Sequence, residues 1–142
     1  MQEMISGEHP FEQVRKFMLA GEQCIDGTSS SQIELYLNLI KEESAEFWNG
    51  LRNQDDIETL DGICDMIVVL VGYAHSRGWN IIGAFEEVAR SNMSKVDRAS
   101  GKILKRADGK VQKPDTYSPP NLAPYIRKPV DMPAYEHIRM GE

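Results

Sequence analysis

Apolar side chains recur at helical spacing in four stretches of the first 95 residues. These stretches cover residues 10–20, 31–52, 55–77 and 80–94. Pro10 suits the first turn of the first helix, and Gly78 is a natural stop for the third. The pattern therefore predicts four helices, with a loop over 21–30 and a short polar turn over 53–56.

The third stretch is apolar almost all round between Ile63 and Tyr73. A helix of that kind belongs in the middle of a bundle. In the fourth stretch, we expect the apolar positions to face inward; they are Ile81, Ile82, Phe85, Val88 and Ala89. The pattern predicts an all-α fold, a four-helix bundle with a core over about residues 10–95.

The composition changes after Lys95, where glycine and proline begin to mark turns. Residues 100–113 fit a small hairpin whose apolar residues are Ile103, Leu104 and Val111. The proline-rich end of the chain is expected to wrap over a neighbour or to trail loosely. We therefore predict a single domain over 1–142, with the helical core followed by an irregular tail over about 96–142.

The composition excludes several classes of protein. A net charge of −6 argues against general nucleic-acid binding, which needs a basic face. No apolar run approaches the roughly 20 residues that span a bilayer, and the first residues do not form a secretory signal. Cys24 and Cys64 are too few for a disulfide framework, and Cys64 is expected to pack as a small hydrophobic residue. A cytoplasmic protein without membrane partners is the simplest interpretation.

Two acidic clusters are the most informative feature of the chain. The first lies on the second predicted helix, and the second lies on the third. Their members are Glu42, Glu43 and Glu46, and then Glu58, Asp61 and Asp65. Because the turn between these helices is short, they should pack antiparallel and bring the clusters together. Converging carboxylates repel one another, and a divalent cation such as Mg²⁺ or Mn²⁺ removes the conflict.

These acidic residues also allow two other interpretations. Glutamates on helices are commonly solvated, and this alternative stays open for Glu42. A carboxylate-bridged di-iron site would need Glu-x-x-His pairs, but none of His9, His75 and His137 follows a glutamate at that spacing. A histidine near the end of a helix, as His75 is, is more often a core or rim residue than a metal ligand.

At these residues the chain resembles the all-α nucleoside triphosphate pyrophosphatase superfamily. This MazG-like group also includes phosphoribosyl-ATP pyrophosphohydrolases and dimeric-dUTPase-type enzymes. Glu42-Glu43-Ser-Ala-Glu46 matches the first half of its signature, Glu-Glu-x-x-Glu, and Asp65 matches the end of the second half, Glu-x-x-Asp. Gly62 stands where that second half has a glutamate. We take Asp61, one residue earlier, as the replacement for this glutamate, and Glu58 is the alternative.

The resemblance continues through Asn92-Met-Ser-Lys95 to Tyr117-Ser-Pro-Pro, as in phage and bacterial MazG-like proteins, and covers about residues 10–125. It implies Mg²⁺-dependent hydrolysis of a (deoxy)nucleoside triphosphate to the monophosphate and pyrophosphate. Glu43, Glu46, Asp61 and Asp65 would then be metal ligands, and Glu42 a further ligand or the group that orients or deprotonates the attacking water. The substrate would be bound by Asn92, Lys95, Lys110 and Lys113. Family members are homodimers or homotetramers, and either state is expected here.

Several alternatives remain open from the residues. Lys95 could simply be a cation at a helix C-terminus, and the basic residues of 102–113 could close over phosphates or be solvated. Trp48 and Trp79 could stack on a base, although packing in a core or interface is more usual. The chain has no P-loop motif. The competing function is a non-catalytic bundle that binds a nucleotide or a partner.

Overall fold

The computed structural model describes residues 8–126, and the fold within this range is mostly helical with a small two-stranded sheet. Four α-helices begin and end within a residue or so of the predicted positions. They are α1 (Pro10–Ala20), α2 (Ser30–Arg52), α3 (Asp56–Ser76) and α4 (Ile81–Met93). The sequence pattern therefore located every α-helix of the described chain.

Polar side chains explain where the longer helices start. The Ser29 hydroxyl accepts from the Gln32 amide at 3.2 Å, and an Asp55 carboxylate oxygen accepts from the Glu58 amide at 2.9 Å. Each bond satisfies an amide that has no partner within its helix. At the other end of α3, Arg77 is the C-cap, and Gly78 follows with φ +70° in the left-handed region.

The described chain divides into two compact units. The first holds α1, α2 and α3, and the second runs from Asn80 to Ile126 with α4. The prediction that all four helices join one bundle therefore remains a prediction.

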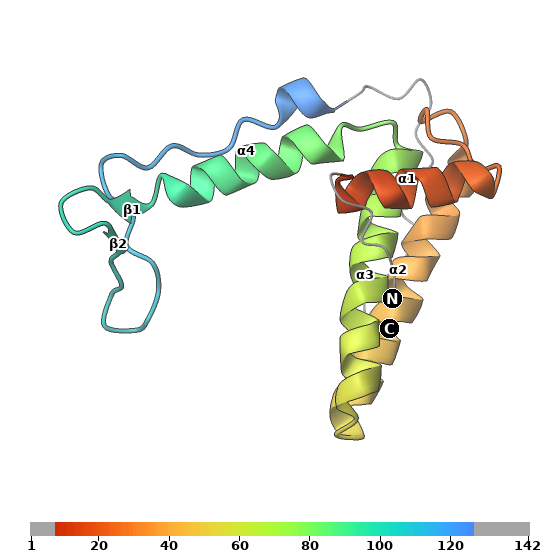
Figure 1. Cartoon of the computed structure of the whole chain (residues 1–142), viewed down its shortest axis with the longest axis horizontal. Helices are drawn as coiled ribbons and strands as arrows, with labels where there is room; N and C mark the ends of the chain where they lie inside the picture. Colours follow the sequence, from red (N-terminus) through yellow and green to blue (C-terminus); the bar gives the residue numbers. More distant parts are fainter. Residues whose placement is uncertain (1–7, 127–142) are drawn as a thin grey trace. The chain divides into compact units, whose positions relative to one another are not determined.

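Helices α2 and α3 form a long antiparallel hairpin in the first unit (Figure 1). Three buried glycines lie on the contact between them. A Cβ at Gly62 would lie 2.9 Å from Phe47 Cα, and a Cβ at Gly50 would lie 2.9 Å from the Thr59 nitrogen. At Gly72, a Cβ would overlap the Tyr36 ring at 2.1 Å. The two backbones therefore approach more closely than residues with a Cβ would allow.

The core of the first unit lies where α1 crosses the end of this hairpin (Figure 1). Met18, Tyr36 and Val69 are buried together there. The Tyr36 hydroxyl donates to Gln23 Oε1 at 2.7 Å, so its polar end is satisfied inside the core. His75 is also buried, with Nε2 2.9 Å from the Phe11 carbonyl oxygen, which agrees with its expected place in the core.

Helix α3 is not covered on all sides by α1 and α2 of the first unit. Its α2-facing side is buried, but four apolar residues at helical spacing on another side are exposed: Leu60, Ile63, Ile67 and Leu70. Cys64 is likewise exposed, so the expectation that it packs as a core residue was wrong. A groove of about 580 Å³ lies between this part of α3 and α1, lined by Phe11, Val14, Phe17, Cys64, Ile67 and Val68.

The second unit holds α4, strands β1 (Val96–Asp97) and β2 (Lys102–Ile103), and a short 3-10 helix, η1 (Ala123–Tyr125). The strands are antiparallel, with Val96 opposite Ile103, and a second bridge joins Lys105 to Val111. The predicted hairpin over 100–113 is therefore real but starts earlier. Phe85 is 55% exposed and Ala89 is exposed, so two of the five residues expected to face inward do not.

The predicted tail is only partly within the described range. Residues 116–121 are bonded to α4 rather than trailing, whereas 127–142 lie outside the described residues. Across residues 8–126, no helix combines the length and apolar character needed to cross a bilayer.

Candidate metal site

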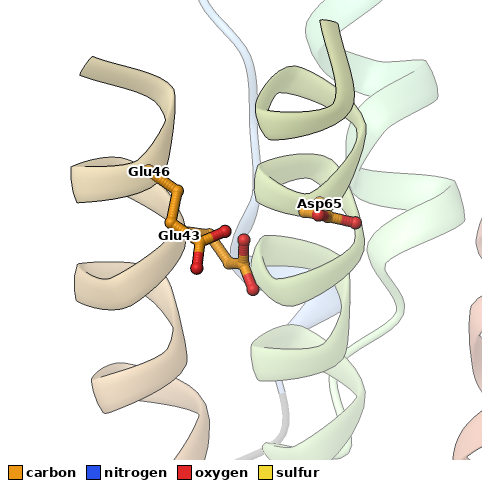
Figure 2. A group of neighbouring side chains, drawn as sticks. All are labelled: Glu43, Glu46 and Asp65. Atoms are coloured by element: carbon orange, nitrogen blue, oxygen red, sulfur yellow. The ribbon is translucent and has the colours of Figure 1, made fainter. Parts of the chain in front are cut away.

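Three carboxylates converge between α2 and α3. Glu43 and Glu46 come from neighbouring turns of α2, and Asp65 comes from α3 (Figure 2). One oxygen from each lies within 4.8 Å of the others. Both acidic clusters predicted from the sequence thus contribute to one group of side chains.

The glycine contact explains why these three side chains meet. Glu46 is next to Phe47 in sequence, and Asp65 is one helical turn beyond Gly62. Since Gly62 lies against the Phe47 backbone, the helices approach each other closely next to the carboxylates. Glu43 is three residues before Glu46 and shares its side of α2. The position of the site is therefore determined by the close approach of the α2 and α3 backbones at Gly62.

Burial and mutual repulsion both act on the acids. Partial burial raises the pKa of Glu43, and the neighbouring charges of Glu46 and Asp65 raise it further. Burial also raises the pKa of Asp65, helped by the charges of Asp61 and Glu46. All of these effects disfavour the ionised forms, so the arrangement is electrostatically unfavourable without a positive partner.

One oxygen of the group has no hydrogen-bond partner among the described residues. Glu43 Oε2 is buried, and nothing in residues 8–126 donates to it. A buried acceptor of this kind costs free energy unless it is satisfied. Carboxylate oxygens are the ligands that Mg²⁺ and Mn²⁺ prefer. The residues present therefore fit a divalent cation.

The other three predicted acids, Asp61, Glu42 and Glu58, are not among the converging carboxylates. Asp61 is exposed and outside the three converging carboxylates, but its charge helps to raise the pKa of Asp65. Glu42 is exposed and adds to the repulsion felt by Glu43. The group of converging carboxylates does not include Glu58, whose backbone amide is bonded to the N-cap Asp55.

Gly62 is the position where the sequence departs from the Glu-x-x-Asp pattern. It is buried at the α2–α3 contact, so a glutamate there would drive its side chain into the Phe47 backbone. In this fold, position 62 serves helix packing, and Asp61 is the acid that remains next to it. The sequence offered a signal for this contact, because one glycine stands on each side of the turn, Gly50 before it and Gly62 after it.

The four predicted substrate-binding residues all belong to the second unit. Lys95 Nζ donates to Asn92 Oδ1 at 3.1 Å, so these two are together, as their spacing predicted. Lys113 lies beside Tyr117, and Lys95 lies near the same ring. Lys110 occupies the hairpin turn without a described contact of its ammonium group. Tyr117 was not recognised from the sequence as a partner of these lysines.

The tryptophans have no visible role in binding a base. Trp48 is exposed and packs edge-on against Phe47, with ring centroids 5.5 Å apart. Trp79 contacts Tyr73 and lies 4.4 Å from the Arg77 guanidinium carbon. Both therefore make packing contacts in the first unit.

Comparison of the chain with models of known protein families and with curated proteins gave no match. The chemistry of the site must therefore be argued from its geometry. That geometry combines three convergent carboxylates, one buried oxygen without a donor, and raised carboxyl pKa values. Functional sites often hold titratable groups in such positions.

Proposed function

We propose that the protein is a metal-dependent nucleoside triphosphate pyrophosphohydrolase of the MazG-like type. The observation that carries the proposal is the meeting of Glu43, Glu46 and Asp65 from two antiparallel helices around a buried oxygen that lacks a donor. The resemblance of Glu42-Glu43-Ser-Ala-Glu46 to the family signature supports the same conclusion. The substrate is a (deoxy)nucleoside triphosphate.

Each acid has a distinct role in this proposal. Glu43, Glu46 and Asp65 would hold Mg²⁺, for which Mn²⁺ can substitute, and Asp61 would add its negative charge beside Asp65. When bound, the cation supplies positive charge that offsets the triphosphate and favours ionisation of the attacking water. Glu42 is exposed beside the group, where it can orient that water and accept its proton.

The reaction is a displacement at the α-phosphorus. The water oxygen forms a bond to that phosphorus, and the bond to the oxygen bridging the α- and β-phosphates breaks. Pyrophosphate leaves with the electron pair of the broken bond, and the water proton passes to Glu42. Asn92, Lys95, Lys110 and Lys113 are the proposed contacts to the phosphates and sugar, because lysine ammonium groups neutralise phosphate.

We also propose that the chain works as a homodimer or homotetramer. The exposed apolar residues of α3 make a stripe without charged side chains, formed by Leu60, Ile63, Ile67 and Leu70. A stripe on one helix can pair with its own copy across a two-fold axis. This pairing would bury the side of α3 that the first unit leaves open.

A panel of all (deoxy)nucleoside triphosphates with Mg²⁺ or Mn²⁺ tests the proposed reaction. The products separate the possible activities, since monophosphate with pyrophosphate indicates attack at the α-phosphorus, and diphosphate with phosphate indicates attack at the γ-phosphorus. Loss of pyrophosphate release in Asp65→Asn, with the helical signal intact, would support the proposal. Absence of release by the wild-type protein with every nucleotide would refute it.

A further inference from the structure

The groove between α1 and α3 is the largest feature of the first unit to which no role has yet been given. Its volume of about 580 Å³ lies within the range of pockets that hold small ligands. Among the described residues that line it, Gln13 supplies the side-chain amide, and the others are apolar apart from the Cys64 thiol. The three converging carboxylates are not part of this lining. A hollow of this composition suits the uncharged part of a ligand.

Helix geometry places the groove next to the candidate metal site. Val68 lines the groove and follows Asp65 by three residues on α3, and Cys64 lines it and follows Asp61 by three residues. Side chains three or four residues apart are neighbours on a helix surface, with about 5–6 Å between their Cβ atoms. The α3 wall of the groove therefore borders both acids of α3. One small ligand can contact the groove and the carboxylates at the same time.

Contacts within the first unit hold the α1 wall in place. Nε2 of His75 lies 2.9 Å from the Phe11 carbonyl oxygen, which ties the first turn of α1 to the end of α3. Val14, which lines the groove, also packs against the buried cluster that contains Met18. These contacts fix the spacing of α1 and α3, so a ligand need not order the walls when it binds.

Phe17 presents an aromatic ring at this groove. The side chain lines the groove, yet it is 67% exposed. No aromatic ring among residues 8–126 packs against it. A flat aromatic ligand can therefore stack on Phe17 and lie against the apolar wall of α3. Every nucleobase has a face of this kind.

We propose that this groove binds the base of the nucleotide whose phosphates lie at the converging carboxylates. The choice of a nucleobase rests on the proposed function, whereas the groove and its position rest on the packing of α1 against α3. Phe17 is the stacking residue, and Val68 forms the opposite wall. Because the lining has few polar groups, the base is recognised by its apolar area rather than by hydrogen bonds. Purine bases are then preferred to pyrimidines, by a modest factor.

Calorimetric titration with α,β-methylene analogues of the nucleoside triphosphates and Mg²⁺ tests this site, because these analogues are not cleaved at the α-phosphorus. Phe17→Ala should weaken binding of the adenine analogue about 5- to 30-fold and leave binding of inorganic tripolyphosphate, which has no base, unchanged. Phe17→Trp should retain the affinity. The adenine analogue should bind about 3- to 10-fold more tightly than the cytosine analogue. Leu19→Ala is the matched control, since Leu19 is 45% exposed on the same helix and does not line the groove.

Cys64 reports directly on occupancy of the groove. In a Cys24→Ser background it is the remaining thiol of the chain, and it is exposed in the first unit. The adenine analogue at saturation should remove most of its reactivity toward a thiol reagent, whereas tripolyphosphate should leave that reactivity unchanged.

Several results would overturn the base site. They are unchanged binding of the adenine analogue in Phe17→Ala, equal weakening in Leu19→Ala, tighter binding of the cytosine analogue, and a Cys64 thiol that reacts equally with and without the adenine analogue. A thiol that is shielded without nucleotide and becomes reactive on dilution would instead assign the groove to a second copy of the chain. Ile67 belongs both to the groove and to the exposed stripe of α3, so this measurement separates the two occupants.

Failure of the base site and failure of the proposed reaction give different results. If the adenine analogue binds in the groove but no nucleotide is hydrolysed, the reaction is wrong and the base site stands. If the wild-type protein hydrolyses nucleotides but Phe17→Ala leaves KM unchanged, the base site is wrong and the reaction stands.

Discussion

Gly62 on α3 lies so close to Phe47 on α2 that a Cβ at position 62 would be 2.9 Å from Phe47 Cα. The three nearest atoms are Phe47 Cα, Cβ and N, which cannot move aside as the end of a flexible side chain can. The contact is one turn from Asp65 and adjacent to Glu46. The separation of these acids therefore depends on a residue that carries no side chain.

Gly62→Ala should lower the free energy of unfolding, because the added methyl group must separate the two helices. Overpacking of this kind costs about 1–3 kcal/mol, which exceeds the gain of up to ~1 kcal/mol from the better helix propensity of alanine. Gly21→Ala is the control, since its nearest neighbour would be 3.5 Å away. Urea unfolding gives the free energy of unfolding of both variants. Equal values would show that the helices can move apart at position 62 without loss of stability.

Glu43→Gln should stabilise the metal-free protein at pH 7. The pKa values of Glu43 and Asp65 are raised in the folded state. Their contribution to stability is therefore full below the ordinary carboxyl pKa values and is lost as pH rises through the folded-state values. Removing one repulsive charge is worth roughly 1 kcal/mol, or a rise of about 4 °C in Tm.

The same substitution should have little effect at pH values below the ordinary pKa of a glutamate, because Glu43 is then protonated in both states. Thermal unfolding in a chelator at both pH values checks the sign. A destabilised Glu43→Gln variant at pH 7 would mean that the carboxylate already has a favourable partner.

Mg²⁺ or Mn²⁺ should raise the Tm of the wild-type protein, since a cation that binds only the folded state stabilises it. The expected gain is about 2.7 kcal/mol at a metal concentration one hundred times Kd. Asp65→Asn should remove most of this gain, whereas Glu58→Gln should retain it, because Glu58 is outside the converging group. Protons compete for the same oxygens, so the gain should shrink as the pH falls toward the carboxyl pKa values.

If Glu58→Gln lost the metal-dependent rise in Tm and Asp65→Asn retained it, the metal would be assigned to the first turn of α3. In that case the alternative acid Glu58, rather than Asp65, would be the ligand. The comparison thus also tests whether Glu58, the alternative to Asp61 for the glutamate of the family signature, binds the metal.

Ile67→Glu should weaken self-association of the chain about 100-fold or more, because a charge would be buried in an apolar interface. Ile67 is 48% exposed in the middle of the α3 stripe. Leu104→Glu in the second unit is the control, with 43% exposure outside that stripe. Light scattering across a concentration series gives the mass of each variant, and a monomeric wild-type protein would refute the proposed oligomer.

The sequence was sufficient for the local structure of the helices. Periodicity located each start to within about one residue, and the structure adds the caps Ser29 and Asp55, since both signals act over a few neighbouring residues. The meeting of Glu43, Glu46 and Asp65 also followed from spacing and a short turn. Both kinds of inference use contacts that are close in sequence or are fixed by helix geometry.

Contacts between distant segments were not predictable in the same way. The pairing of Val96 with Ile103 and the position of Tyr117 beside two lysines depend on how the chain returns to the end of α4. The exposure of Phe85 and of the α3 stripe was also missed. Periodicity shows that a helix has an apolar side, but it does not show whether the same chain covers it.

The glycines along α2 and α3 have a consequence for how related sequences would diverge. Because Gly50 and Gly62 lie against the backbone of the facing helix, the outward positions of both helices can change without altering the distance between the acids. A relative with the family's glutamate at position 62 would need a wider spacing of the two helices there, so a glycine at this position would mark the sequences that share the close contact.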